Sequence, residues 1–342
     1  MNLGIDLGTS RIIIYDPARG VVLDEPSVIA VAASDGHVVA FGSEAAEMLG
    51  RTPDTIIAAR PVQNGVIAEY ELAEKLLRCC LARVCSNRIT KPCVAVSVAE
   101  QVTEVEQRSF IEAVISAGAR RVTLVPETVA AAIGAGVDVS LPLGQMLVNV
   151  GGGTVDASVL SLKGEAVSST MRAAGDAMDE AIVRYLRAQY GLIISESTAE
   201  RIKIEAGCVL PQEPILVAEA KGRDSMSGLP RAVTVTSDEI CTAIREPVRE
   251  ILDMVGQVLE ITPPELAGDM MDTGICLTGG LAQLRGFAEL LEQTIGVPCR
   301  VADNPAQCVA IGAGKALQYA SSFSKVYDLG SFSYRLSDNV TN

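Results

Sequence analysis

Short apolar runs, broken by glycine-rich and polar turns, alternate with amphipathic stretches along most of the chain. Runs of aliphatic and β-branched residues predict strands, whereas apolar residues spaced three or four apart predict helices. Early in the chain, the pattern predicts strands at residues 3–6, 11–15, 27–32, 38–41, 93–98 and 122–125. Helices are expected at residues 43–49 with Ser43 as the cap, at 71–84, at 103–117 behind a capping box, and from 127 onward.

The same alternation of strands and helices continues in the second part of the chain. Strands are expected at residues 145–150, 155–162 and 275–277, and helices at 176–190, 197–207, 237–259, 284–295 and 305–320. Pro247 lies inside the third of these helices and is expected to kink or split it. Strands that alternate with helices in this way are typical of an α/β fold.

The two parts of the chain share one sequence plan. Gly4–Thr9 and Val148–Thr154 both run from an apolar strand through Asp or Asn into a glycine turn and a Thr, and another strand follows. An internal duplication of this kind predicts two similar lobes that face one another. The length of 342 residues also suits more than one subdomain.

Composition narrows the class of protein. The chain has 42 acidic and 28 basic residues, a formal net charge of −14, and therefore lacks the basic character expected of a nucleic-acid partner. The longest run without a polar side chain, Val129–Val137, is too short to span a membrane, and the start of the chain does not resemble a signal peptide. Nine cysteines without a CxxC pair indicate reduced thiols in the cytosol, and a single histidine, His37, argues against a zinc site or a histidine-based triad.

Glycine turns between strands are candidate phosphate sites because several backbone N–H groups can approach one anion there. Gly8–Thr9 or Gly151–Thr154 alone is more typical of an ordinary tight hairpin. The two turns together, with a third turn at Thr278–Gly280 ahead of a predicted helix, favour a nucleotide whose phosphates are clamped from two sides. Asp6, at the end of the first strand, is a candidate carboxylate on the metal side, and its alternative role is to cap the turn.

With these turns and many further segments, the chain resembles the actin-like ATPase superfamily of actin, heat-shock chaperones and sugar kinases. Within that superfamily it resembles the MreB family of bacterial rod-shape filament proteins, from about residue 2 to residue 318. The matching segments are Gly4–Ser10, Leu23–Val31, Met48–Pro53, Arg60–Tyr70, Val125–Gly136, Val150–Leu162, Ala174–Tyr185, Thr198–Gly207, Gly228–Val235, Thr262–Asp269, Gly274–Gly280 and Cys308–Leu317. Chaperones and sugar kinases lack the Arg60–Tyr70 and Thr262–Leu266 segments in this arrangement.

The resemblance implies the actin-like two-lobed α/β fold, with duplicated core subdomains and with ATP and Mg²⁺ in the cleft between the lobes. Four subdomains are expected. They are IA at residues 1–30, 71–140 and 311–342, IB at 31–70, IIA at 141–177 and 241–310, and IIB at 178–240.

The resemblance also implies a role for individual residues. Thr9, Ser10 and Arg11 occupy the first phosphate loop, and Gly152, Gly153 and Thr154 occupy the second. Glu200, Arg201, Ile202 and Lys203 match the ribose and base segment, and Thr278, Gly279, Gly280 and Leu281 match the adenosine-side turn. Glu127 matches the water-orienting glutamate, with Thr154 assisting, and Asp6 and Asn149 match the metal side. Without the resemblance, Glu200 and Lys203 would suggest only a surface ion pair.

Five residues depart from the family pattern, and two of them, Asn64 and Glu69 in place of Asp, are expected to matter little at the active site. Asn149 stands where the family has Asp, which should weaken Mg²⁺ binding and slow hydrolysis, because an amide carries no charge. Thr128 replaces a Pro after the catalytic glutamate, and Arg11 replaces a small polar residue. The Arg11 guanidinium is expected either to bind phosphate or to point along the strand into solvent.

The expected function is an ATP-binding cytoskeletal protein that polymerises beneath the cell membrane and directs cell-wall synthesis and cell shape. Its expected partners are further copies of itself, cell-wall synthesis and membrane-anchor proteins, and, weakly, the membrane surface through Ser86–Lys91. One alternative is a family member that binds nucleotide and barely hydrolyses it, for which Asn149 is the main support. A second alternative, an ATPase of the chaperone or kinase type, would need a substrate domain or an acceptor-site insert that the sequence does not show.

Overall fold

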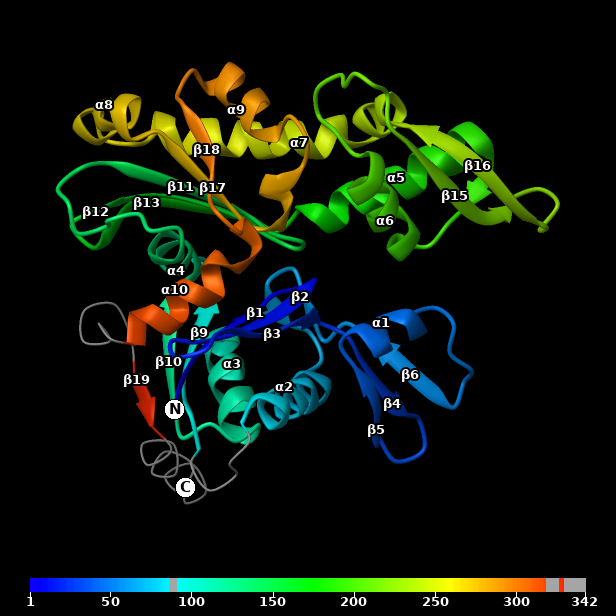
Figure 1. The fold of residues 1–342 in the computed structure, drawn as a ribbon, viewed down its shortest axis with the longest axis horizontal. Helices are drawn as coiled ribbons and strands as arrows, with labels where there is room; N and C mark the ends of the chain where they lie inside the picture. Colours follow the sequence, from blue (N-terminus) through cyan, green and yellow to red (C-terminus); the bar gives the residue numbers. More distant parts are fainter. Residues whose placement is uncertain (86–90, 318–325, 329–342) are drawn as a thin grey trace. The chain divides into compact units, whose positions relative to one another are not determined.

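The computed structural model describes residues 1–85, 91–317 and 326–328, and these residues form two compact units (Figure 1). Unit 1 comprises Met1–Leu141, Leu162–Gly164 and Gln307–Asn342. Unit 2 comprises Pro142–Ser161 and Glu165–Ala306. Most of the predicted membrane loop, residues 86–90, lies outside the described residues. Within the described residues, no helix combines the length and the apolar character needed to cross a membrane.

Unit 1 is built on a six-stranded sheet in the order β19-β10-β9-β1-β2-β3. Its strands are β1 (Asn2–Leu7), β2 (Arg11–Asp16), β3 (Gly20–Pro26), β9 (Cys93–Val98), β10 (Arg121–Pro126) and β19 (Val326–Asp328). β1, β9 and β10 run parallel, while β1, β2 and β3 form an antiparallel meander. Because parallel strands need crossover connections, α2 (Tyr70–Val84) and α3 (Glu104–Ser116) join these strands and bury their apolar faces against the sheet.

Two further helices of unit 1 approach each other unusually closely. α4 (Glu127–Gly134) packs against α10 (Cys308–Ala316), and α10 also packs on β1 (Figure 1). A Cβ on Gly312 would lie 1.6 Å from the carbonyl oxygen of Ala130, and one on Gly134 would lie 1.8 Å from that of Cys308. Glycine is therefore required at both positions, and the close packing holds α4, which begins at Glu127, against α10.

Unit 1 also carries a small sheet in the order β5-β4-β6, covered by a short helix. The elements are β4 (Ile29–Ala32), β5 (Val38–Phe41), α1 (Ser43–Met48) and β6 (Ile56–Ala59), followed by the two-stranded pair β7 (Val62–Gln63) and β8 (Val66–Ile67).

Unit 2 repeats the main plan with a five-stranded sheet in the order β13-β12-β11-β17-β18. Its strands are β11 (Gln145–Val150), β12 (Val155–Ser161), β13 (Gly164–Met171), β17 (Ile275–Thr278) and β18 (Cys299–Val301). The accompanying helices are α7 (Ser237–Glu260), α8 (Pro264–Thr273) and α9 (Phe287–Ile295). A smaller part of unit 2 joins α5 (Gly175–Tyr190) and α6 (Glu196–Ala206) to a sheet of β14 (Leu192–Ile193), β15 (Val217–Asp224) and β16 (Pro230–Thr236).

The α/β class and most elements agree with the sequence-based expectation. The strands at Val38–Phe41, Cys93–Val98 and Gln145–Val150 have the predicted bounds. The predicted capping box is also present, because Thr103 accepts from the Glu106 N–H while Glu106 accepts from the Thr103 N–H.

Several local predictions were wrong. Ser43 does not cap α1, because the N-cap is Gly42, and the Ser43 N–H and hydroxyl both donate to Glu25 on β3. Of the two outcomes expected for Pro247, a kink or a split, the split is wrong, because α7 is helical from Ser237 to Glu260. The two helices expected at 284–295 and 305–320 begin later, at Phe287 and Cys308. A 3₁₀ turn occupies Pro305–Gln307, while residues 284–286 are not helical and Arg285 forms a bridge with Cys208.

Candidate nucleotide-binding site

The first predicted phosphate loop joins β1 to β2 in unit 1. The Gly8 N–H donates to the carbonyl of Arg11 at 3.0 Å, which closes the turn with Thr9 and Ser10 at its tip. The carbonyls of Gly8 and Ser10 accept from the side chain and the backbone N–H of Ser27, at 2.7 and 3.0 Å. Three carbonyls of the loop are thus bound within the protein, which suits a turn that offers its N–H groups to an anion.

The second loop joins β11 to β12 in unit 2 and closes in the same way. The Gly151 N–H donates to the carbonyl of Thr154 at 2.8 Å, with Gly152 and Gly153 at the tip. The carbonyls of Gly151 and Gly152 accept from the N–H groups of Gly175 and Asp176, at 3.3 and 2.8 Å. The first turn of α5 therefore holds this loop, just as Ser27 holds the first one.

The carboxyl group of Asp6 lies behind the first loop. The Ser97 hydroxyl donates to its Oδ1 at 3.3 Å, and this oxygen lies 3.8 Å from the point that a Cβ on Gly8 would occupy. Burial raises the pKa of Asp6 to about 7, the hydrogen bond from Ser97 opposes that rise, and the charge of Asp24 adds to it. A cation near Asp6 would favour the ionised carboxylate, so this environment fits a metal-side role.

Asn149 lies buried on β11, one strand residue before the second loop. The Thr278 hydroxyl on β17 donates to Asn149 Oδ1 at 2.9 Å. Directly opposite on β12 lies Asp156, whose side chain is fully buried and whose Oδ1 accepts from Thr170 at 2.5 Å. Paired residues of neighbouring strands project from the same face of a sheet, so Asn149 has a carboxylate as its neighbour. No role was predicted for Asp156 from the sequence.

The third glycine turn is pressed against the second loop. A Cβ on Gly279 would lie 2.2 Å from the carbonyl oxygen of Val150, and its φ of +86° also favours glycine. The Gly279 N–H donates to the carbonyl of Pro305 at 2.9 Å. The predicted adenosine-side residues Gly280 and Leu281 follow in a 3₁₀ turn, with Leu281 buried. Thr278–Leu281 and the second phosphate loop therefore form one continuous group in unit 2.

Lys203 on α6 is buried and faces inward. Its ammonium group donates to Asp179 Oδ2 and to the carbonyl of Gly175, both at 2.8 Å. A Cβ on Gly175 would lie 3.2 Å from the Cα of Gly152. Burial raises the pKa of Asp179 to about 7, and the charge of Lys203 opposes that rise. The Lys203–Asp179 pair thus ties α6 to the first turn of α5, and through it to the second loop.

The remaining members of the predicted ribose and base segment differ in position. Ile202 is buried in the core of unit 2, whereas Arg201 is exposed and pairs with Glu205 at 2.7 Å. Glu200 is half-buried on the same helix. The alternative of a surface ion pair does not describe Lys203, because its side chain is buried and its carboxylate partner at 2.8 Å is Asp179.

Two departures from the family pattern have defined partners in unit 1. Arg11 forms an ion pair with Asp24 on the adjacent strand β3, with 2.6 Å between nitrogen and oxygen. The Thr128 hydroxyl donates to Glu100 Oε1 at 2.6 Å, next to Glu127 at the start of α4. Asp24 lies in the matching segment Leu23–Val31, but no role was predicted for it or for Glu100.

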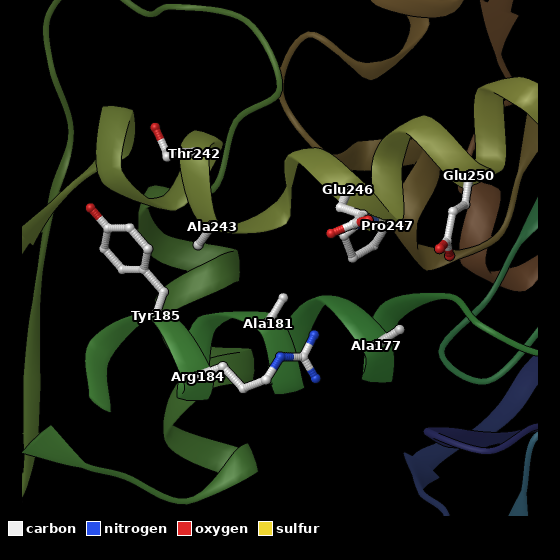
Figure 2. A pocket seen from close by; sticks show the side chains of 9 residues that line it. All are labelled: Ala177, Ala181, Arg184, Tyr185, Thr242, Ala243, Glu246, Pro247 and Glu250. Atoms are coloured by element: carbon white, nitrogen blue, oxygen red, sulfur yellow. The ribbon is translucent and has the colours of Figure 1, made fainter. Parts of the chain in front are cut away.

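A separate groove of about 430 Å³ lies between α5 and α7 in unit 2 (Figure 2). Figure 2 shows Arg184 on α5 and Glu246 and Glu250 on α7 at this groove, with alanines between them. No residue predicted to bind nucleotide lines it. Among residues 1–85, 91–317 and 326–328, no group of three or more His, Cys, Asp or Glu side chains is arranged to hold a metal by itself.

The duplicated sheets and loops define an actin-like nucleotide-binding fold, and solved structures share it. MreB5 of Spiroplasma citri bound to AMPPNP superposes with a TM-score of 0.88 at 32% identity, covering 93% of this chain and 96% of that one. The MamK double helical filament has a TM-score of 0.78 at 20% identity, covering 92% of this chain and 98% of that one, which shows likeness of fold alone.

Sequence comparison identifies the family. The family model described as MreB/Mbl protein matches residues 1–325. The cell shape-determining protein MreB of Escherichia coli (strain K12) is 46% identical over 323 residues, covering 93% of either chain. The cell shape-determining protein Mbl of Bacillus subtilis (strain 168) is 43% identical over 317 residues, covering 92% of this chain and 95% of that protein. The chain belongs to the MreB/Mbl family.

Proposed function

We propose that this protein is an ATP-binding, actin-like cytoskeletal protein that polymerises into filaments at the inner face of the cell membrane and directs cell-wall synthesis and cell shape. Curated relatives at 43–46% identity carry the name cell shape-determining protein. MreB5 of Spiroplasma citri was solved with AMPPNP and with ADP, and MamK was solved as a double helical filament. The family membership argues against the alternative of a chaperone-type or kinase-type ATPase.

The observation that carries the nucleotide proposal is the identical closure of the two glycine turns. Gly8 donates to Arg11 and Gly151 donates to Thr154, three residues on in each case. In both loops, the carbonyls are held by donors from elsewhere in the same unit. Anion binding explains this shared arrangement, because it needs N–H groups that point outward from a turn without obstructing side chains.

We propose that Mg²⁺ enters with the nucleotide. The fit rests on Asp6, whose pKa is raised to about 7 by burial and which would gain from a nearby cation, and on Asn149 Oδ1. Mg²⁺ prefers oxygen ligands, usually keeps several waters, and neutralises phosphate charge when bound. Asp6 and Asn149 would therefore hold its water shell through hydrogen bonds.

For hydrolysis, we propose that Glu127 orients the attacking water and that the Thr154 hydroxyl assists. A half-buried carboxylate at the start of α4 can accept a proton from a water and align it with the phosphate. A carboxylate has two oxygens that accept hydrogen bonds, which suits the orientation of a water.

A second candidate function is a filament protein that binds ATP and hydrolyses it weakly. Asn149 favours it, since a carboxamide oxygen has two lone pairs and Thr278 already occupies one of them. An aspartate would add charge and further acceptor sites for the waters of a metal ion. Measured phosphate release separates this candidate from an efficient ATPase.

The experiment that tests nucleotide binding compares two glycine substitutions. Gly152→Val places a branched side chain at the tip of the second loop and is expected to reduce ATP affinity at least 100-fold. Gly268→Val is the matched control, because a Cβ at Gly268 on α8 meets no atom within 4 Å. Isothermal titration of both variants and the parent with ATP and Mg²⁺ measures the affinities. Equal affinity of Gly152→Val and the parent would contradict the proposed site.

A further inference from the structure

The first turn of α4 is held by a side chain from outside the helix. α4 begins at Glu127, and its N-cap is Pro126, which makes no side-chain capping hydrogen bond. The first N–H groups of a helix have no partner within the helix, so they bind to a side chain, another part of the backbone or water. Glu100 Oε1 accepts from the Thr128 N–H at 3.4 Å and from the Thr128 hydroxyl at 2.6 Å. Glu100 therefore serves as the cap of α4, although it lies 28 residues before Thr128 in the chain.

The strand register explains why these two residues meet. β9 and β10 are parallel neighbours in the sheet of unit 1, and Val98 pairs with Pro126 where both strands end (Figure 1). Glu100 lies two residues beyond Val98, and Thr128 lies two residues beyond Pro126. Because neighbouring parallel strands end at the same edge of a sheet, residues equally far beyond a paired position emerge close together. The register of the sheet thus brings Glu100 to the start of α4.

The contact between Thr128 and Glu100 is short and sheltered from solvent. Thr128 is fully buried and Glu100 is half-buried. A distance of 2.6 Å between the two oxygens is typical of a hydroxyl that donates to an ionised carboxylate, and such bonds are roughly twice as strong as neutral ones. The segment that carries Glu100 is fixed on its other side, because the capping box of Thr103 and Glu106 starts α3 there.

α4 is consequently held at both ends. Its C-terminal part packs on α10, where Gly134 and Gly312 leave no room for a Cβ. Its first turn is bound to Glu100 through Thr128. Glu127 comes directly before Thr128, so the position of its carboxylate depends on this anchor. Proline, which the family pattern has at position 128, offers neither of the two donors, so the anchor depends on the threonine of this chain.

We propose that Glu100 is a positioning residue for ATP hydrolysis, which acts through Thr128 to hold the Glu127 carboxylate where it orients the attacking water. The inference rests on the proposed role of Glu127. A displacement of about 1 Å at a reacting group can lower a rate on the order of 100-fold, so an anchor next to this carboxylate has a large effect on turnover. The glycine loops bind the phosphates without it, so ATP affinity does not depend on the anchor.

Thr128→Val tests the anchor, because it removes the hydroxyl and nearly preserves the shape of the side chain. Phosphate release at saturating ATP and Mg²⁺ is expected to fall about tenfold, while the ATP affinity measured by isothermal titration changes less than about twofold. Thr128→Ser keeps the hydroxyl and should keep most of the turnover. The matched control is Thr262→Val in unit 2, since Thr262 is also buried and its hydroxyl also donates at 2.6 Å, to the carbonyl of Val258.

Substitutions of Glu100 show whether it acts through Thr128. Glu100→Gln keeps an acceptor oxygen and should lose less turnover than Glu100→Ala. Combining Glu100→Ala with Thr128→Val should lower turnover no further than either change alone, because the two residues act as one unit. A loss with Glu100→Ala and none with Thr128→Val would mean that Glu100 acts on the water directly, and this result would overturn the proposal.

Hydrogen exchange gives a measurement that does not depend on hydrolysis. In Glu100→Ala, the amide of Thr128 is expected to exchange about tenfold faster than in the parent, because it loses its acceptor. The amide of Gly134 should keep the parent's rate, because α10 holds that end of α4. Equal exchange at Thr128 in the variant and the parent would show that Glu100 does not anchor the helix.

The control separates positioning from a structural role alone. A purely structural bond predicts that Thr128→Val and Thr262→Val lower the melting temperature alike and leave phosphate release alike. Equal turnover of these two variants would therefore overturn the proposal. A parent protein that binds ATP and releases no phosphate would instead contradict the proposed hydrolysis itself.

Discussion

Asn149 presents a neutral amide at the position where the family pattern has a carboxylate. Its Oδ1 accepts from Thr278, and Asp156 lies opposite it in the β11–β12 register. A second carboxylate at position 149 would therefore face Asp156 across the strand pair and destabilise the ligand-free protein. A bound metal ion would offset this repulsion. The effect of an aspartate at position 149 on stability therefore depends on whether Mg²⁺ is bound.

Asn149→Asp is expected to raise phosphate release about tenfold. Charge-assisted hydrogen bonds are roughly twice as strong as neutral ones, so the added charge should stabilise the metal water shell by about 1–2 kcal/mol. Without Mg²⁺, the variant should melt at a lower temperature than the parent, and Mg²⁺-ATP should remove that difference. Phosphate release at saturating Mg²⁺ and thermal melting are the measurements.

Glu127→Ala supplies the baseline for that experiment, because it should bind ATP and release almost no phosphate. A rate for Asn149→Asp no higher than the parent's would show that position 149 does not limit turnover. The candidate of a weakly hydrolysing filament would then lose its structural support.

At the scale of elements, the Lys203–Asp179 pair joins α5, α6 and the second loop. Lys203→Met leaves a buried carboxylate without its cation and is expected to cost about 3 kcal/mol of unfolding free energy. The charge of Lys203 lowers the pKa of Asp179, so its removal raises that pKa further above the unfolded value of 3.8. A group with a raised pKa in the folded state loses its contribution to stability as the pH rises, so the variant should be least stable in alkali.

Denaturant unfolding of Lys203→Met between pH 5 and 9 measures this effect. The control is Lys203→Met combined with Asp179→Leu, which removes both charges and should recover much of the loss with no such pH dependence. ATP affinity should fall with Lys203→Met and partly return in the double variant, because the pair positions the loop. A double variant as unstable as the single one would contradict the pairing.

The turn between β15 and β16 is expected to give the opposite pH dependence of stability. Hydrogen bonds from Ser227 and Met226, together with Arg231, lower the pKa of Asp224 to about 2. A lowered pKa stabilises the fold above the unfolded value of 3.8, and this contribution disappears as the pH falls toward 2. Asp224→Asn should therefore be less stable than the parent at neutral pH and equally stable near pH 2. Chemical denaturation at the two pH values measures the difference, and a constant gap at both would contradict the assignment.

The sequence predicted the elements whose apolar residues alternate strongly. It predicted poorly the elements whose buried side chains are small, and the contacts between residues far apart in the chain. β15 was missed because its buried residues, Ala218 and Ala220, carry little apolar signal beside the exposed Glu219 and Lys221. The tight turns of the two phosphate loops, between β1 and β2 and between β11 and β12, could be predicted from the glycine pattern. The inward position of Lys203 did not, because Asp179 lies 24 residues away and helical spacing relates only near neighbours.

At the scale of the whole molecule, net charge opposes assembly. Copies that each carry a formal charge of −14 repel one another, so filament contacts must bring complementary surfaces together. The match over residues 1–325 to the MreB/Mbl family and the likeness to MreB5 support assembly as the central activity. This level of organisation was predicted from the sequence through the resemblance, whereas composition alone indicated only a folded, acidic α/β protein.

The most direct test of the account is nucleotide-dependent assembly of the purified protein. We expect the parent chain to sediment as polymer with ATP and Mg²⁺ and to show filaments by negative-stain electron microscopy, while Gly152→Val stays in the supernatant under the same conditions. A parent protein that remains in the supernatant with ATP and Mg²⁺ at every concentration tested, or that assembles equally with the Gly152→Val change, would contradict the proposed ATP-dependent filament.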